Sequence, residues 1–405
     1  MKYIILIGDG MSDHPVDELG GKTPLQFADT SVMDRLAAEG TLGMVRTVPD
    51  GYPPGSDVAN LSILGYDPAK YYTGRSPLEA ASIGVDLGSD DLSLRCNLVT
   101  LEGEGEGTVM GDYSAGHIGT DEAAELIAAL DGELAGDGVR FYPGVSYRHL
   151  MVWSGGPDGL ETVPPHDISG RAVQGHFPKG SGAERLNDLM EQARTVLSNH
   201  PVNERRRAAG KPPANAIWLW GEGRRPAMPT ISERYRIEGA IISAVDLMKG
   251  LGIYAGLKVV DVPGATGYLD TNYKGKVEYG LNELNERELV CIHVEAPDEA
   301  GHNGNVKDKV QAIEDFDRKV VGRVVEALRG ADDYRLLILC DHPTPVMLKT
   351  HVSEPVPFIL YPSRAGDGDN GGGGDGYNEE AARGTGLFLK EGYNILSKLL
   401  GREGV

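Results

Sequence analysis

The sequence predicts an α/β fold in which a mostly parallel central sheet is flanked by helices. Three segments support this prediction: residues 1–10, 289–302 and 335–351 each begin with an apolar run typical of a buried strand and continue into acidic or histidine residues. In open α/β sheets, ligands bind at the carboxyl ends of the strands. We therefore expect the three strands to deliver their polar residues to one edge of the sheet, where the functional site would lie.

A chain of 405 residues is too long for one ordinary hydrophobic core, so we expect two domains. Residues 1–67 and 216–405 are predicted to form a discontinuous core domain that carries the three strands. Residues 68–215 differ from them in pattern, because several short strands alternate there with two helices. Besides these two helices, at 120–130 and 183–198, it contains a short helical stretch at 78–83. We predict that this segment is an inserted α+β domain.

The core elements follow from apolar periodicity and from helix start and stop signals. A glycine follows the first strand, another ends the helix over 23–40, and Ser56 opens a periodic run. The helix over 306–328 has a long apolar face. Further predicted core elements are strands at 216–220, 257–262 and 355–361, helices at 239–248 and 277–285, and a helix at 380–400 that breaks near Gly392.

The inserted segment shows alternating strands, a Gly/Glu turn and capped helices. Three arginines at 205–207 precede two prolines, which indicates a solvated helix end and a linker. The glycine-rich run at 367–376, near the end of the core, predicts a surface loop. The other predicted elements of the inserted segment are helices at 78–83, 120–130 and 183–198, strands at 92–99 and 145–153, and a hairpin tip at 102–107.

The amino-acid composition limits which binding partners and which cellular compartment we expect. The formal net charge is −21, so a nucleic-acid backbone would be repelled on average. No uncharged apolar span approaches 18 residues, and the first apolar run is too short for a signal peptide. With three cysteines and no such signal, we expect a protein of the reducing cytoplasm. A small anionic substrate is compatible with this charge, as is a homo-oligomer.

Ser56 allows two interpretations. It follows a Pro/Gly-rich turn and opens a helix, and serine is among the favoured N-cap residues. The alternative is a nucleophilic serine at a place where backbone N–H groups and the helix dipole favour a bound phosphate. Residue type and position alone favour the N-cap interpretation, and the nucleophilic role is the alternative.

Carboxylates and imidazoles at the strand ends have the spacing of metal ligands. Asp298 and His302 are four residues apart, so one helical turn brings them to one face. Asp341 and His342 end another strand, and His351 follows on the loop. Mixed carboxylate and imidazole ligation suits Mn²⁺, Zn²⁺ or a related divalent ion rather than Ca²⁺. Asp9 ends the first strand, whereas His14, His200 and His293 have no such neighbours in sequence and are interpreted as structural or exposed.

These residues lie in motifs that cover the chain essentially end to end: IGDGMSD, PPGSDVANLSILGYDP, YYTGRSPLEAASIGVDL, RCNLVT, DYSAGHI, WLWGEG, HVEAPDEAGH and CDHPTPVMLKTH. The chain resembles the alkaline-phosphatase superfamily and, within it, the archaeal-type 2,3-bisphosphoglycerate-independent phosphoglycerate mutases. The resemblance implies an alkaline-phosphatase-like fold with an inserted cap. It implies two divalent metal ions, with Mn²⁺ expected and Zn²⁺, Co²⁺ or Mg²⁺ as alternatives. The implied ligands are Asp9, Ser56, Asp341 and His342 for one ion and Asp298, His302 and His351 for the other.

The resemblance also implies a reaction, that of an isomerase of glycolysis and gluconeogenesis. Ser56 would take the phosphoryl group from 3-phosphoglycerate, and the bound glycerate would reorient and receive it on its other hydroxyl. The inserted domain would orient the glycerate. Arginine matches carboxylate and phosphate by its fork geometry. The candidate substrate-binding residues in this domain are Arg75, Arg95, Arg148, His149, His166 and Asp167.

Other functions share the same metal chemistry. A homoserine kinase-like phosphotransferase would need a phosphoryl donor, and the sequence has no P-loop or kinase motif. A metal-dependent phosphomonoesterase would transfer the phosphoryl group to water. A non-catalytic binding protein on the same scaffold is disfavoured, because the nucleophile and all six acidic and histidine ligands occur together.

Overall fold

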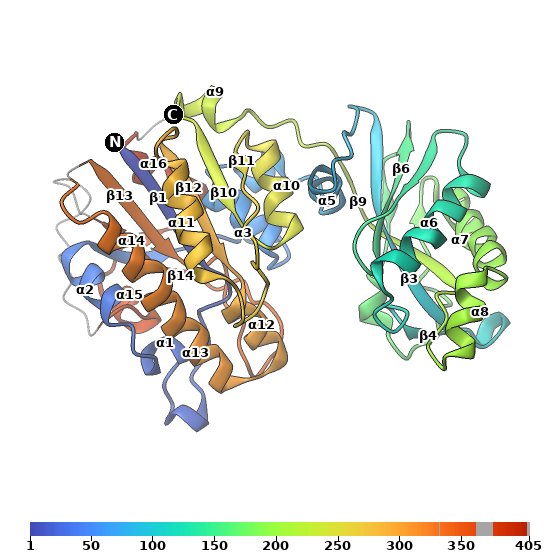
Figure 1. The fold of residues 1–405 in the computed structure, drawn as a ribbon, viewed down its shortest axis with the longest axis horizontal. Coiled ribbons are helices and arrows are strands. Elements are labelled where there is room, and N and C mark those ends of the chain that lie inside the picture. Colours follow the sequence, from blue (N-terminus) through green and yellow to red (C-terminus); the bar gives the residue numbers. More distant parts are fainter. Residues whose placement is uncertain (332, 362–375, 403–405) are drawn as a thin grey trace. The chain divides into compact units, whose positions relative to one another are not determined.

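The computed structural model describes residues 1–331, 333–361 and 376–402 and divides into two compact units (Figure 1). The first unit comprises Met1–Tyr72 and Ala227–Val405, and the second comprises Thr73–Pro226. Apart from Gly376, the predicted glycine-rich loop at 367–376 lies outside the described residues.

The unit boundaries differ from those expected from the sequence, which placed the inserted segment at 68–215. The strand β9 (Ala216–Arg224) pairs antiparallel with β3 (Asp91–Glu102), so it belongs to the second unit rather than to the first. The apolar run at 216–220 fits a buried strand of either sheet, because local sequence does not specify the pairing partner.

The first unit is built on an eight-stranded sheet of order β11-β10-β12-β1-β13-β14-β2-β15. Its five strands β11, β10, β12, β1 and β13 run parallel, and β14 is antiparallel to both of its neighbours. This confirms the mostly parallel sheet. The strands are β1 (Lys2–Gly8), β2 (Thr41–Val45), β10 (Gly239–Ile242), β11 (Lys258–Val259), β12 (Leu289–Val294), β13 (Tyr334–Leu339), β14 (Val356–Tyr361) and β15 (Phe388–Leu389).

The central strands have continuous apolar sequences because helices cover both faces of the sheet. One group of mutually contacting helices includes α2, α11 and the segment from α13 to α14, and it packs on β12 and β14. The other group includes α3, α10 and α16 and packs on β10 and β13. The helices are α1 (Pro24–Phe27), α2 (Ser31–Glu39), α3 (Ser56–Ile63), α4 (Pro68–Tyr71), α9 (Ile231–Tyr235), α10 (Asp246–Tyr254), α11 (Tyr273–Glu283), α12 (Ala296–Asn303), α13 (Val306–Phe316), α14 (Gly322–Ala327), α15 (Glu379–Gly384) and α16 (Ile395–Leu400).

Some predicted helices are wrong or shorter than expected. Residues 239–242, predicted as the start of a helix, form the buried strand β10, because a short apolar run fits either structure and only pairing with β12 decides. The predicted helix at 23–40 is two helices, and strand β2 follows it. The predicted helix at 306–328 is continuous but contains a π-helical turn at Asp317–Val321.

The second unit has a five-stranded sheet of order β4-β3-β6-β5, with β9 on the other edge of β3. Helices α6 and α7 pack against β5 and β9 and enclose the main core of the unit, whereas α5 contacts β3, β6 and β9. The elements are α5 (Ser76–Ser82), β4 (Val109–Asp112), α6 (Thr120–Leu134), β5 (Val139–Tyr142), β6 (Arg148–Ser154), β7 (Leu160–Glu161), β8 (Lys179–Gly180), α7 (Ala183–Ser198) and α8 (Pro201–Ala208). No helix among the described residues is long and apolar enough to cross a membrane.

Candidate metal centre

The register of the central strands brings the predicted ligands to one edge of the sheet. Ile7 of β1 lies beside His293 of β12 and beside Leu339 of β13. The residues that follow these strands therefore leave the sheet at the same level. Asp9 follows β1, Asp341 follows β13, and α12 after β12 carries Asp298 and His302.

Ser56 is the first residue of α3, and the helix N-cap is Gly55. The N-cap interpretation of Ser56 is therefore wrong, and the serine side chain is free for another contact. Its Oγ lies 2.9 Å from Nε2 of His342. Asn60, one turn further along α3, donates from Nδ2 to Asp341 Oδ2 at 2.8 Å, so α3 packs against the ligand cluster at two points.

One part of the cluster contains Asp9, Asp341 and His342. Nε2 of His342 lies 3.6 Å from Asp9 Oδ1 and 3.4 Å from Asp341 Oδ2. Gly10 donates its backbone N–H to Asp341 Oδ1. Gly10 has φ +63°, and a Cβ there would come within 2.8 Å of Asp298, so only glycine allows this close approach.

A second part contains Asp298, His302 and His351. Nε2 of His302 lies 2.8 Å from Nε2 of His351, and the two atoms lie 3.2 and 3.4 Å from Asp298 oxygens. Ligand atoms of Asp298, His342 and His351 all lie within 4.8 Å of one another. His342 therefore lies close to both predicted ligand sets.

The hydrogen bonds of these imidazoles fit a bound cation. Nδ1 of His302 contacts the carbonyl of Lys349, and Nδ1 of His351 contacts that of Pro54. A carbonyl only accepts, so each Nδ1 carries a proton, and the two Nε2 atoms face each other across 2.8 Å. Without a metal ion, a proton on Nε2 of His302 joins the two rings. When that proton leaves, both Nε2 lone pairs converge on one point, so the donor set fits a divalent ion.

The charges around the cluster also favour cations. Burial and the neighbouring carboxylates of Asp341 and Asp298 raise the pKa of Asp9 well above its usual range. The hydrogen bond to Asp298 raises the pKa of His302 to about 9. Burial lowers the pKa of His342. Buried carboxylates at this density need positive charge nearby, and divalent ions supply it.

His293 is a residue that the sequence interpretation missed. It is fully buried, and its Nε2 lies 3.2 Å from Asp9 Oδ2. Ligand atoms of Asp9, His293 and Asp341 lie within 4.8 Å of one another. Its position in the sequence could have indicated this role. His293 lies near the end of the predicted strand, two residues before Glu295 and five residues before the predicted ligand Asp298.

In the second unit, the structure brings three of the predicted arginines together around a glutamate. Arg95 of β3 donates to Glu79 of α5 at 2.8 Å, and Arg75 lies 3.3 Å from the same carboxylate. Burial alone would raise the pKa of Glu79. The positive charges of Arg95, Arg75 and Arg148 lower it below its usual value instead. Glu79 itself was missed, although its spacing of four residues from Arg75 in a helix indicates such a pair.

Aromatic rings complete this group. The Arg95 guanidinium lies 4.0 Å from the ring centre of Trp220, and the His166 ring packs edge-on against Trp220. His166 is exposed and lies 3.6 Å from Asp167. Burial and the nearby arginines lower the pKa of His166. The cluster therefore offers a cationic, partly open surface suited to a small anion.

His149 does not join this group. It pairs with Cys96 across the sheet, so it points to the face opposite Arg95, where it is buried and accepts the Gly144 N–H at Nδ1. Burial lowers its pKa to about 3. The prediction that His149 binds substrate together with the arginines is not supported by its position.

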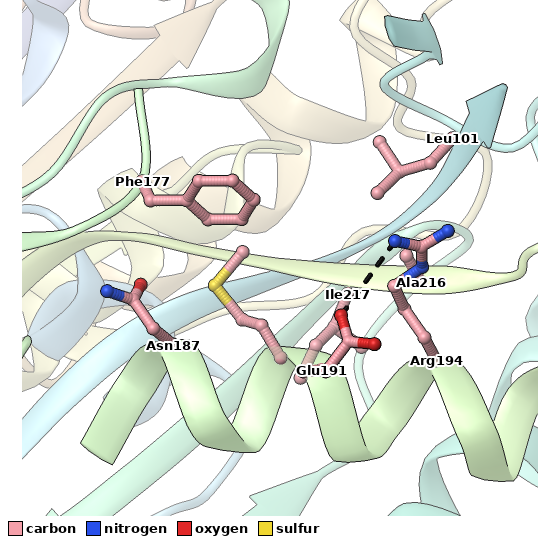
Figure 2. A pocket seen from close by; sticks show the side chains of 8 residues that line it. Leu101, Phe177, Asn187, Glu191, Arg194, Ala216 and Ile217 are labelled. Atoms are coloured by element: carbon pink, nitrogen blue, oxygen red, sulfur yellow. Dashed lines mark ion pairs between the residues drawn. The ribbon is translucent and has the colours of Figure 1, made fainter. Parts of the chain in front are cut away.

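Arg206, interpreted from the sequence as part of a solvated triplet, is buried and paired with Glu122. An apolar pocket of about 220 Å³ lies elsewhere in the second unit, between α7 and strands β3 and β9 (Figure 2). Figure 2 shows Glu191 and Arg194 as an ion pair at one side of this pocket. Its lining includes none of the predicted ligands or substrate-binding residues. The lining residues are Leu101, Phe177, Asn187, Met190, Glu191, Arg194, Ala216 and Ile217.

Comparisons with known proteins point to one family. The family model described as 2,3-bisphosphoglycerate-independent phosphoglycerate mutase matches residues 37–203. A probable enzyme of this name from Geobacter sulfurreducens is 56% identical over 99% of this chain and 100% of its own length. The enzyme of this name from Methanosarcina acetivorans is 52% identical, with the same coverage.

Solved structures agree with this result. The PH0037 protein of Pyrococcus horikoshii has a TM-score of 0.83 at 31% identity and covers 100% of this chain and 98% of its own. The cofactor-independent phosphoglycerate mutase of Thermoplasma acidophilum has a TM-score of 0.68 at 29% identity, with both chains fully covered.

Proposed function

This chain belongs to the 2,3-bisphosphoglycerate-independent phosphoglycerate mutases, and we propose that it interconverts 3-phosphoglycerate and 2-phosphoglycerate through a phosphoserine at Ser56. The observation that carries this proposal is the position of Ser56. Its Oγ lies at the N-terminus of α3 and 2.9 Å from His342 Nε2, beside the carboxylates of the metal centre.

The position of Ser56 suits both its attack on the phosphoryl group and the binding of that group once it is transferred. The backbone N–H groups at the start of α3 can donate hydrogen bonds to a phosphoryl oxygen, and the helix dipole favours its negative charge. Asn60 donates to the backbone carbonyl of Ser56 and to Asp341, so it fixes the first turn of α3 against the ligand cluster. The serine is therefore held ready for in-line transfer.

A hydrogen-bond chain orients the imidazole of His342. Thr344 donates its hydroxyl proton to Asp298 and accepts from His342 Nδ1 at 3.2 Å. This leaves the Nε2 lone pair directed at Ser56 Oγ. The same lone pair is available to a metal ion beside Ser56, and burial, which lowers the pKa of His342, keeps the ring neutral for that role.

The family is metal-dependent, and the donor set fits two divalent ions. We propose Mn²⁺, held by Asp9, Ser56, Asp341 and His342 at one position and by Asp298, His302 and His351 at the other. When bound, two such ions lower the pKa of the serine hydroxyl and neutralise the charge of the transferring phosphoryl group.

Substrate contacts are proposed for the cationic cluster of the second unit. Arg75 and Arg148 would offer guanidinium groups to the glycerate carboxylate, and Arg95 would support them from its buried pair with Glu79. His166 and Asp167 lie at the exposed side of the same cluster. A phosphoserine protected from water while glycerate reorients favours isomerisation over hydrolysis. We propose that this occurs in the cytoplasm, as a step of glycolysis and gluconeogenesis.

The test is an assay with Mn²⁺ and 3-phosphoglycerate in which 2-phosphoglycerate and inorganic phosphate are both measured. We expect 2-phosphoglycerate from the wild type, and loss of at least about 10³-fold in Ser56→Ala, because covalent catalysis has no second nucleophile. Ser62→Ala is the matched control, since Ser62 lies on the same helix and only bonds the Val58 carbonyl.

Two other outcomes would replace the proposal. Release of phosphate without 2-phosphoglycerate would indicate a phosphomonoesterase. Formation of O-phosphohomoserine from ATP and homoserine, with no turnover of phosphoglycerates, would indicate the homoserine kinase-like alternative.

A further inference from the structure

His293 is the buried histidine of the sheet edge whose role the proposed function leaves unassigned. It lies at the end of β12, with no exposed surface, between Glu295 on one side and Asp9 on the other. A buried imidazole costs free energy unless both of its nitrogens are satisfied. The partners of its two nitrogens therefore indicate what it does.

The first nitrogen is bound to a carboxylate that stays ionised. Nδ1 of His293 lies 3.1 Å from Glu295 Oε1. Glu295 also accepts from Lys276, whose ammonium is fully buried, and from the hydroxyl of Ser243 at 2.8 Å. Burial alone would raise the pKa of Glu295, but Lys276 and His293 hold it far below its usual range.

This environment selects one tautomer of the ring. An ionised carboxylate only accepts, and the Ser243 hydroxyl gives its proton to the same Glu295 oxygen. The proton of the neutral His293 ring therefore lies on Nδ1, and the lone pair lies on Nε2. Such an arrangement of carboxylate and imidazole is how proteins orient histidine as a metal ligand.

The second nitrogen faces oxygen atoms but has no hydrogen bond. Nε2 lies 3.2 Å from Asp9 Oδ2, yet it has no hydrogen-bond partner among the described residues. The other Asp9 oxygen, Oδ1, is likewise buried and unpartnered within that part of the chain. Together with Asp341, these ligand atoms lie within 4.8 Å of one another. A lone pair directed at carboxylate oxygens is repelled unless a proton or a metal ion lies between them, and three ligand atoms at this spacing suit a metal ion.

We propose that His293 binds a divalent cation through Nε2, together with Asp9 and Asp341, and that Glu295 and Lys276 orient it for this role. The inference deepens the proposed function, on which it rests. It adds one neutral nitrogen donor to the ion beside Ser56, which the carboxylates would otherwise hold with His342. A neutral donor leaves more of the positive charge of the ion available to the serine oxygen and the phosphoryl group.

The direct test is the crystal structure of the wild-type protein grown with Mn²⁺, with anomalous scattering recorded at the manganese edge. We expect a peak at about 2.2 Å from His293 Nε2, a typical metal–nitrogen distance. If manganese peaks are present and each lies more than about 3 Å from this atom, the inference is wrong, because His293 then serves only to position Asp9.

The second test measures Mn²⁺ binding by calorimetry. His293→Ala should weaken one of two binding events by about 100-fold, the upper end of the losses seen around metal ligands. His14→Ala is the matched control, since His14 is a partly exposed histidine paired with Glu354. Unchanged affinity in folded His293→Ala protein, judged by circular dichroism, would contradict the inference.

These readouts separate the two proposals. If the wild type forms 2-phosphoglycerate and manganese is found away from His293, the proposed function stands and this inference fails. If manganese is bound by His293 but only phosphate is released, the inference stands and the proposed reaction fails.

Discussion

At the residue scale, two arginines of the same cluster should behave differently when they are removed. Arg95 is buried and pairs with Glu79, whereas the Arg75 side chain is 42% exposed. Burial decides how much of each side chain's role is structural. An exposed cation can be lost at little cost to the fold, but removing one partner of a buried pair leaves the other charge without its main compensation.

We predict that Arg75→Ala raises the KM for 3-phosphoglycerate about tenfold, or about 1.4 kcal/mol, and changes the free energy of unfolding by less than about 0.5 kcal/mol. Arg95→Ala should raise KM and also lower the free energy of unfolding by about 3 kcal/mol. Steady-state kinetics and urea unfolding measure both quantities. Equal stability losses in the two variants would show that burial does not separate their roles.

At the element scale, the loop between His342 and His351 sets the spacing of the metal centre. Its first half is anchored: Lys309 donates to the Thr344 carbonyl, and Asp13 accepts the backbone N–H of Val346. Its tip is exposed, with Met347 71% accessible. The loop therefore has a rigid part that orients ligands and a tip whose length could change without disturbing the core.

We predict that a Gly-Ser insertion between Met347 and Leu348 lowers kcat at least about 100-fold, because it displaces His351 from Asp298 and His302. The free energy of unfolding should fall by less than about 1 kcal/mol, since longer surface loops cost little. Thermal unfolding and phosphoglycerate turnover check both points. The same insertion after Gly105, in an exposed turn of the second unit, is the control, and full turnover of the loop variant would refute the spacing role.

The junction of α13 and α14 offers a second element-scale prediction, on pH. Asp317 in the π-helical turn accepts the backbone N–H groups of Val32 and Met33, and thereby caps α2 from another helix. Burial raises its pKa to about 6, despite these bonds. The folded state therefore binds a proton more tightly than the unfolded state. This contribution to stability is complete below about pH 4 and is lost as the pH rises through 6.

We predict that the free energy of unfolding of the wild type, minus that of Asp317→Asn, falls by about 2 kcal/mol between pH 4 and pH 7. Urea unfolding at a series of pH values measures this difference. Asparagine keeps an oxygen that can cap α2 but does not titrate. A difference that is constant over this range would mean that Asp317 titrates alike in the folded and unfolded states.

At the scale of the whole molecule, the two units are separate in structure. The second unit has its own core, and its ends lie side by side, because Thr73 donates its hydroxyl to the carbonyl of Arg224 at 2.7 Å. When the two ends of an inserted domain lie close together, the domain can be removed without breaking the sheet of the domain that carries it. The metal centre lies entirely in the first unit.

We predict that residues 73–226 fold alone, with one cooperative unfolding transition and no Mn²⁺ binding. Residues 1–72 joined to 227–405 by a short Gly-Ser linker should bind Mn²⁺ and release phosphate from 3-phosphoglycerate without forming 2-phosphoglycerate, because the proposed glycerate-binding arginines are then absent and water can take the phosphoryl group. Circular dichroism, calorimetry and product analysis test these points. Formation of 2-phosphoglycerate by the joined protein would show that the second unit is not needed for isomerisation.

The sequence by itself determined the parallel sheet and the polar residues at its edge. Continuous apolar runs such as residues 3–7 cannot be half-exposed strands, and residues after parallel strands must meet at one edge. The i, i+4 spacing of Asp298 and His302 likewise determined that they share a helix face. These features are local or follow from strand direction, so they need no knowledge of distant contacts.

Only the tertiary structure decided which strand belongs to which sheet and which side chains share a pocket. The run at 216–220 pairs with β3, and residues 239–242 form a strand, because pairing partners far away in the chain choose between equally good local options. His293 looked structural because its importance comes from Asp9 and Lys276, distant residues that meet it only after the sheet has formed. His149 and Arg95 were grouped by type, and the alternation of strand faces separates them.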